Sequence, residues 1–422
     1  MSRRHRVARR AVHALLGRVD SGRLELVEDG VAHVLGASAA AARPPLRARI
    51  EVRSPAFYPA LLRGGAGAGG AYMDGLWDCE DLVALVCVAA RAMDGVDRVR
   101  ERLLPLTAPV QRTAWRLRGN SRARARARIS AHYDLGNTLF SRFLDETMMY
   151  SSGIFERPDA TLHDAQVAKL ERICRRLALG PADHVLEIGT GWGGFALHAA
   201  GRYGCRVTTT TISHEQHAHA LAAVRAAGLE DRVTVLLQDY RDLRGSYDKL
   251  VSIEMVEAVG WEHLDTYFRV CSERLAPTGT MLLQAIVHPE RVFRVEKASS
   301  GFINRYIFPG GTLPSLGAIE RSLARATDLR SIGLQDITPH YARTLHCWRE
   351  RFLAAWPELS TLGYDERFRR MWVLYLAYCE AGFLERRIRV VQLQLAKPAF
   401  RAKPLVEAVC LPSTTTQLAL AE

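Results

Sequence analysis

The most constraining feature of the chain is a glycine-rich turn that joins an apolar segment to a helical pattern. Residues 184–198 read HVLEIGTGWGGFALH. Gly189, Gly191 and Gly194 follow the spacing G-x-G-x-x-G, which lets the backbone turn sharply and approach a ligand where a Cβ atom would collide. A strand that enters such a loop and continues into a helix predicts an α/β fold that binds a nucleotide-like ligand.

The second expected strand bears on which nucleotide binds. A nicotinamide dinucleotide site needs an acid at the end of that strand, about 20 residues on, to hold a ribose hydroxyl. Here the strand over 206–212 ends around Thr211, which is not an acid. Residues 213–216 form an S-x-x-Q pattern that is typical of a capping box at the start of the next helix. The sequence therefore disfavours NAD.

The remaining polar residues favour S-adenosylmethionine (SAM). The acid lies inside the first strand, at Glu187, and a third strand over 233–237 leads into Gln238 and Asp239. Because parallel strands end at one edge of a sheet, these side chains should surround ribose and adenine. We expect a doubly wound, Rossmann-like α/β domain of a SAM-dependent methyltransferase.

Composition is that of an ordinary globular protein. The chain has 422 residues, of which 48% are hydrophobic, so two domains are expected. No apolar run approaches the roughly 20 residues of a membrane-spanning helix. The eight cysteines are scattered, without a C-x-x-C pair or a histidine cluster. We therefore expect reduced thiols, a cytoplasmic location and no metal.

Positive charge is concentrated in two places. The net charge is +12, residues 102–133 contain eight arginines and no acid, and six arginines precede the first acid, Asp20. Apolar residues in the first segment fall at helical spacing: Val7, Ala11, Val12, Leu15, Leu16 and Val19. A basic amphipathic helix and a basic linker favour peripheral binding to an anionic membrane at the inner face of the cell membrane. A solvated arginine-rich linker is the alternative, and without a nucleic-acid motif we expect no nucleic-acid partner.

The N-terminal part should form a small α+β domain. A hairpin is expected from strands at 22–27 and 31–35, and a flexible loop at the glycine-rich segment 64–70. Helical patterns follow at 81–93 and 95–104. We place this domain at 1–105.

Three further regions follow the small domain. They are a basic linker at 106–130, a catalytic domain at 131–400 and a C-terminal tail at 401–422. The mostly helical pattern between 300 and 395 is expected to be an insertion that builds a substrate channel over the active site.

Several segments together resemble cyclopropane-fatty-acyl-phospholipid synthases. Besides the glycine loop with Trp192, they are HYDLGN at 132–137, FLDETM at 143–148, YSSGIF at 150–155, QDYRD at 238–242, YIFPGG at 306–311, HYARTL at 340–345 and YCEAGF at 378–383. The resemblance covers roughly residues 20–398, including YMDG at 72–75 and WDC at 77–79.

This resemblance implies a reaction. The methyl group of SAM would be transferred to a cis double bond in an unsaturated phospholipid acyl chain. Bicarbonate would then deprotonate the resulting carbocation, and a cyclopropane ring would close. A hydride shift before proton loss would instead give a methylene branch. A homodimer is expected at the level of the family.

The resemblance also assigns roles to residues. Glu257 would orient the bicarbonate, Tyr341 would hydrogen-bond it and face the cation, and Cys379 would line the site. The SAM contacts would be Tyr150, Ser151, Glu187, Gly189, Gly191, Trp192, Gly193, Thr211, Gln216, Gln238 and Asp239.

Two residues depart from the usual pattern of these synthases. Ser152 replaces a common cysteine, and its backbone N–H could still hold the ion. Gln284 replaces a common histidine and can neither become cationic nor shuttle a proton. Ring and branch therefore stay open as products. Two other classes also stay open: a methyltransferase with a small soluble substrate, and a membrane-associated relative that has lost activity.

Overall fold

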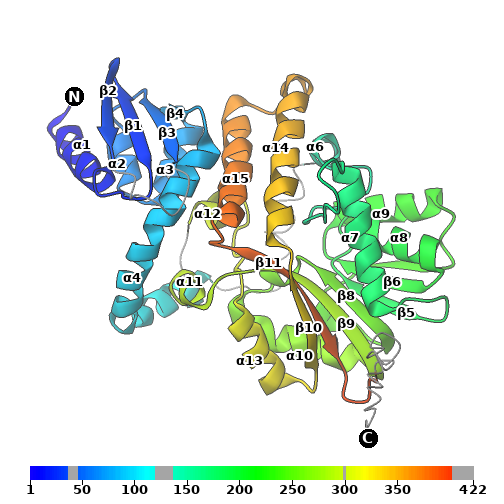
Figure 1. The fold of residues 1–422 in the computed structure, drawn as a ribbon. Coiled ribbons are helices and arrows are strands. Elements are labelled where there is room, and N and C mark those ends of the chain that lie inside the picture. Colours follow the sequence, from blue (N-terminus) through cyan, green and yellow to red (C-terminus); the bar gives the residue numbers. More distant parts are fainter. Residues whose placement is uncertain (37–45, 119–135, 298–300, 402–422) are drawn as a thin grey trace, which may run out of the picture.

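A seven-stranded sheet forms the centre of the larger part of the protein (Figure 1). The computed structural model describes residues 1–36, 46–118, 136–297 and 301–401. The sheet has the order β10-β11-β9-β8-β5-β6-β7, and β11 is antiparallel to both of its neighbours while the other pairs are parallel. Its strands are β5 (His184–Ile188), β6 (Arg206–Thr211), β7 (Val233–Leu237), β8 (Tyr247–Ile253), β9 (Leu275–Val287), β10 (Arg330–Asp336) and β11 (Arg389–Ala396).

Helices cover both faces of this sheet, each over its own hydrophobic cluster. One face carries α7 (Leu162–Leu177), α8 (Gly194–Tyr203) and α9 (His214–Ala226), and the other carries α10 (Leu264–Arg274) and α13 (Leu316–Ala326). Shorter elements are α6 (Asn137–Phe143), η1 (Tyr240–Asp242), η2 (Val256–Ala258), η3 (Trp261–His263), α11 (Glu290–Glu296) and α12 (Phe302–Tyr306). The predicted doubly wound α/β domain is confirmed.

The block after residue 300 differs from the expected helical insertion. Two of its segments are strands that complete the sheet: β11 pairs with β9, and β10 pairs with β11 at the edge. The inserted part is the pair of helices between them, α14 (Thr338–Thr361) and α15 (Glu366–Leu384), which stand side by side next to the sheet (Figure 1). The alternating apolar pattern VVQLQL at 390–395 is typical of a strand, and these residues form part of β11.

The N-terminal part contains a second, four-stranded sheet in the order β2-β1-β3-β4. Its strands are β1 (Arg23–Glu28), β2 (Val31–Leu35), β3 (Arg47–Val52) and β4 (Trp77–Cys79), with α1 (Arg3–Leu16), α2 (Phe57–Leu61), α3 (Gly65–Met73) and α4 (Leu82–Arg118) around them. The predicted hairpin is present, and Asp29 and Gly30 form its turn with positive φ angles.

The glycine-rich segment 64–70 is wrongly predicted as a flexible loop, because helix α3 begins at Gly65. Packing explains the difference. A Cβ atom at Gly69 would lie 2.3 Å from Phe302 Cδ2, and one at Gly70 would lie 2.8 Å from the Tyr306 hydroxyl. The glycines therefore let α3 approach α12 closely, which offsets their low helix propensity.

The helical region after the small sheet also differs from the sequence-based expectation. The two helices expected at 81–93 and 95–104 form one helix, α4, which continues to Arg118 through the first half of the predicted linker. Ion pairs hold α4 against distant segments: Arg91 with Glu385, and Asp97 with Arg387 at 2.7 Å. The remaining linker residues 119–130 and the tail after residue 401 lie outside the described residues, and the division into domains remains a prediction.

Buried Arg370 of α15 joins the small domain to the catalytic part. Its guanidinium donates to the carbonyl oxygens of Tyr72 and Trp77 and pairs with Asp78 at 2.7 Å. It also lies 4.0 Å from the ring centroid of Tyr72. Within the described ranges, no helix is both long and apolar enough to cross a bilayer.

Candidate active site

The glycine loop lies between β5 and α8 at the carboxyl edge of the sheet. Gly189, Gly191 and Gly193 have φ angles of +103°, +53° and +98°, which favour residues without a side chain. A Cβ atom at Gly194 would lie 2.5 Å from the Thr147 carbonyl oxygen, whereas the space beside Gly191 is open. The loop thus presents bare backbone at the start of α8, where N–H groups favour a negatively charged group.

The ends of β6 and β7 supply polar side chains beside this loop. The Thr211 hydroxyl donates to Gln216 Oε1 at 2.8 Å, and Ser213 caps α9 by accepting from the Gln216 N–H. Only half of the predicted capping box therefore forms. Gln238 donates to the Asp242 carbonyl oxygen at 2.8 Å, and Asp239 pairs with Arg241 at 2.6 Å.

A fully buried lysine lies next to Ser151, one of the predicted SAM contacts. Lys169 of α7 donates to the Ser151 hydroxyl at 2.9 Å. Burial lowers its pKa to about 8, although Glu254, Asp145 and Glu187 oppose this shift. Glu187 accepts from Thr209 at 2.7 Å, and burial raises its pKa to about 8. The sequence analysis missed Lys169, since a single lysine on an amphipathic helix gives no signal.

Aromatic rings surround Tyr150, which the resemblance places near SAM. Its ring centroid lies 5.2 Å from those of Phe140 and Trp348, and its hydroxyl lies 2.7 Å from that of Tyr375. Trp192 of the glycine loop packs 4.7 Å from Phe140. Phe143 and Trp372 extend this cluster. The cluster offers negative ring faces to a cation and keeps water away.

A carboxylate that the sequence analysis did not select connects three of the predicted catalytic residues. Glu254 Oε1 accepts from the Ser152 N–H at 2.9 Å and from the Gln284 amide at 2.8 Å. Its Oε2 accepts from the Tyr341 hydroxyl at 2.6 Å. Glu254 follows β8 directly, Gln284 lies in β9 and Tyr341 in α14, so the carboxylate joins the sheet to the inserted helices.

Neighbouring side chains orient these donors. Gln392, which is paired with Gln284 across β11 and β9, donates to Gln284 Oε1 at 3.0 Å and so turns its amide nitrogen toward Glu254. The Tyr341 ring stacks on Phe383 at 4.4 Å. Burial raises the pKa of Tyr341 well above its ordinary value, so it remains a donor.

Glu257 has different contacts from those that the resemblance implies. Its Oε1 accepts from the Ile286 N–H at 2.5 Å, and its buried Oε2 has no hydrogen-bond partner among the described residues. Burial and the nearby Glu254 charge raise its pKa to about 8. Glu257 is therefore mostly protonated at neutral pH, and the role that the resemblance assigns to it remains a prediction.

Cys379 lies on α15, and burial raises its pKa to about 12. It is therefore a thiol at neutral pH, which disfavours a nucleophilic role. The expectation that it lines the site remains a prediction.

The two groups that the resemblance implies fit this site differently. SAM fits, because the glycine loop leaves space that side chains would fill and because Thr211, Gln216 and Asp239 are buried polar residues at the same edge. Bicarbonate does not fit, because the donors expected to hold it (the Ser152 N–H, Gln284 and Tyr341) are all bound to Glu254.

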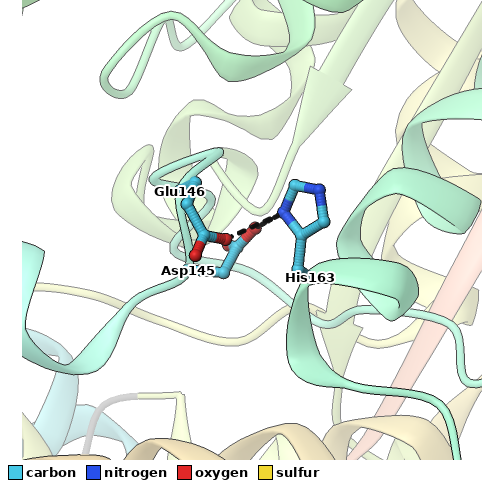
Figure 2. Close-up of side chains that lie close together, drawn as sticks. All are labelled: Asp145, Glu146 and His163. Carbon is cyan, nitrogen blue, oxygen red and sulfur yellow. Dashed lines mark hydrogen bonds and ion pairs between the residues drawn. The ribbon is translucent and has the colours of Figure 1, made fainter.

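One group of potential metal ligands lies outside this site. Figure 2 shows His163 facing Asp145 and Glu146, with Nδ1 at 3.1 Å and 3.0 Å from their carboxylates. Both Asp145 oxygens also accept hydrogen bonds from Thr147. These contacts account for the cluster as a partly exposed ion pair that fixes the loop before Met148.

The fold and the glycine loop define the class of protein, a SAM-dependent methyltransferase. Comparison with known proteins narrows this class. The family described as mycolic acid cyclopropane synthetase matches residues 120–393. The chain therefore belongs to the cyclopropane synthase family.

Two relatives illustrate its range. Tuberculostearic acid methyltransferase UfaA1 of Mycobacterium tuberculosis is 42% identical over 339 residues, 78% of each chain. Cyclopropane-fatty-acyl-phospholipid synthase of Escherichia coli is 39% identical over 355 residues, 83% of this chain and 88% of the relative. The crystal structure of mycolic acid cyclopropane synthase CmaA1 complexed with SAH and CTAB matches with a TM-score of 0.60 and 32% identity, covering 64% of this chain and 98% of that chain.

Gly189→Ala should weaken SAM binding about tenfold or more. The φ angle of +103° strains any other residue, by about 1–3 kcal/mol, and the new Cβ would lie 3.1 Å from Met255. Isothermal titration of SAM measures the effect. Gly228→Ala is the control, since Gly228 also has a positive φ but follows α9 with open space around its Cβ position. Equal affinities for both variants would contradict the assigned loop.

Glu257→Gln should change the pH dependence of stability. Between about pH 4.5 and about pH 8 the folded protein keeps the Glu257 proton while the unfolded chain releases it. The free energy of unfolding of the wild type therefore falls as pH rises through this window, by up to about 1.4 kcal/mol per pH unit from this group. The free energy of unfolding of the variant should not fall in this way, so the variant should become more stable relative to the wild type as the pH rises. Urea unfolding of both proteins between about pH 4.5 and about pH 8 tests this. If their unfolding free energies change with pH in the same way, the raised pKa of Glu257 is contradicted.

Proposed function

We propose that the protein transfers the methyl group of SAM to a cis double bond in an unsaturated acyl chain of a membrane phospholipid and closes a cyclopropane ring. The observation that carries the proposal is the aromatic cluster around Tyr150 and Trp192, beside the glycine loop that is proposed to bind SAM. An alkene is a weak nucleophile, so its methylation needs a dry site and stabilisation of the cation that forms. The polar acceptor of a small soluble substrate would find few partners there.

The assignment of SAM contacts is part of this proposal. SAM supplies an electrophilic methyl group when bound. The glycine loop with Trp192 would hold its amino acid part, Tyr150 and Ser151 would close over it, and Glu187 would support the loop from below. Thr211, Gln216, Gln238 and Asp239 would bind ribose and adenine.

The aromatic rings near Tyr150 would stabilise positive charge on the acyl chain. Tyr341, Gln284 and Glu257 would lie at the reacting carbons, with Cys379 beside them. We assign no step to bicarbonate, because its expected donors are already engaged.

A branched product is the second candidate. Gln284 occupies a position where many synthases that the chain resembles have histidine, and one relative is a tuberculostearic acid methyltransferase. In this alternative a hydride shift precedes proton loss and leaves a methylene branch. Both products require the same first step.

Incubation of the purified protein with SAM and oleoyl-phospholipid vesicles should add one CH₂ unit per modified acyl chain, as measured by mass spectrometry of the extracted lipid. An ozone-resistant product identifies a ring, whereas an ozone-cleavable product identifies a methylene branch. Absence of any mass gain, with SAM still bound, would contradict the proposed acceptor and favour a soluble substrate or an inactive relative.

We further propose that helix α1 binds an anionic membrane surface, as a peripheral contact. The predicted apolar face divides in two: Val12 is buried, whereas Val7 and Leu15 are 63% and 54% exposed. Arg3, Arg4 and Arg10 are exposed on the same helix. Arg9 instead pairs with Glu28 and so holds α1 to the small sheet.

The homodimer expected for the family is testable by sedimentation velocity.

Replacing Arg3, Arg4 and Arg10 with serine should weaken binding to vesicles that contain phosphatidylglycerol by about 100-fold, at about 1 kcal/mol per arginine. Vesicle co-sedimentation measures the affinity. Serine at the exposed Arg206, Arg225 and Arg244 of the catalytic domain is the control. Binding that is equal for neutral and anionic vesicles, or insensitive to salt, would rule out the electrostatic contact.

A further inference from the structure

The carboxylate of Glu254 occupies the position that an external anion would need. Three donors from three different segments converge on its two oxygens: the Ser152 N–H, the Gln284 amide and the Tyr341 hydroxyl. A free bicarbonate at these donors would have to displace a carboxylate that is covalently attached and already hydrogen-bonded. The intramolecular group has the advantage, because it loses no translational freedom on binding.

The backbone at Glu254 indicates that this position is held for a reason. Its φ angle is +50°, in the left-handed region that a residue with a side chain rarely adopts. The Glu254 N–H donates to the Gln284 carbonyl oxygen at 2.8 Å, which fixes the residue at the end of β8. Strained conformations of this kind cluster at functional sites, where surrounding contacts maintain them.

Glu254 is less buried than the residues that surround its carboxylate. Ser152, Gln284 and Gln392 are completely buried, and Tyr341 is nearly so, whereas Glu254 keeps part of its surface uncovered. Among these residues, Glu254 is therefore the one that its neighbours cover least.

The other nearby groups are less suited to accept a proton. Gln284 has no basic atom available, since its oxygen is bound to Gln392. Tyr341 donates to Glu254, and burial keeps the Cys379 pKa at about 12. Within the described part of the chain, the Glu257 carboxylate accepts from the Ile286 N–H alone, and its pKa is about 8, so it carries its own proton at neutral pH.

Electrostatics favour ionisation of Glu254 over Glu257. Burial raises the pKa of Glu254, but three hydrogen bonds and the Lys169 charge oppose that rise. Glu257 lacks that support, and repulsion between the two carboxylates discourages ionisation of both. A carboxylate whose pKa is raised is a stronger base, once ionised, than a carboxylate in water.

We propose that the side chain of Glu254 is the catalytic base of this enzyme and takes the place of bicarbonate. This inference rests on the proposed methylation of an alkene. The alkene electron pair forms the new bond to the SAM methyl carbon, and the carbon–sulfur bond breaks with its pair going to sulfur. Glu254 then accepts a proton from that methyl group, and the released electron pair closes the ring or, after a hydride shift, forms the methylene double bond.

The test compares the wild type with Glu254→Gln and Glu254→Gly in buffer purged of CO₂, with and without added bicarbonate or formate. Glycine removes the carboxylate, suits the positive φ angle and opens a space of the size of a small anion. Glu262→Gln, at an exposed carboxylate in the following turn, is the control for loss of a charge. Turnover on oleoyl-phosphatidylglycerol vesicles and binding of radiolabelled bicarbonate are both measured.

The wild type should turn over equally with and without bicarbonate and should bind none of it. Glu254→Gln should bind SAM normally but lose about 100-fold or more in turnover, as expected for removal of a general base. Glu254→Gly should be similarly slow, should bind one bicarbonate, and should regain activity when bicarbonate or formate is added.

Bicarbonate bound to the wild type, a wild-type rate that falls when bicarbonate is removed, or full activity of Glu254→Gln would overturn the inference. The binding measurement separates this outcome from failure of the proposed function. If no alkene lipid is methylated, the proposed function fails, while an anion site that appears only in Glu254→Gly still supports the assignment of the carboxylate.

Discussion

The hydrogen bonds to Glu254 are the contacts on which the arrangement of the reaction site depends. They join four segments that lie far apart in sequence: the loop at Ser152, the end of β8, strand β9 and helix α14. Because hydrogen bonds to a charged group are stronger than those between neutral groups, this carboxylate fixes the inserted helices over the sheet.

The surroundings of this carboxylate combine two requirements that usually conflict. The carbocation of the proposed reaction would need a dry, aromatic site, which Tyr150, Trp348 and Tyr375 would supply, whereas a base needs enough polarity to stay ionised. Lys169 helps to meet both requirements, because its buried ammonium group interacts electrostatically with Glu254, Asp145 and Glu187 and so favours their ionised forms. Its position between α7 and the loop at Ser151 places this charge out of reach of solvent.

The sequence was sufficient to predict the catalytic fold and most of the edge where SAM is proposed to bind, because the glycine loop and the strand ends are local patterns. The sequence was insufficient to predict contacts between residues that are distant in the chain and meet only through packing. Helix α3 forms despite its glycines because Phe302 and Tyr306 need their space, and these residues are more than 200 positions away. Motif matching also selected Glu257, whereas the hydrogen bonds to Ser152, Gln284 and Tyr341 converge on Glu254, three positions earlier. Only the tertiary structure distinguishes these two carboxylates, since both lie in one short segment.

The most direct test of this account is the fate of the transferred methyl group when the enzyme uses SAM with a fully deuterated methyl, in buffer free of bicarbonate. The account predicts a lipid product that gains one CD₂ unit, because a deuteron leaves the methyl group for Glu254 without any external ion. A product that retains all three deuterium atoms, or a reaction that proceeds only when bicarbonate is restored, would contradict it.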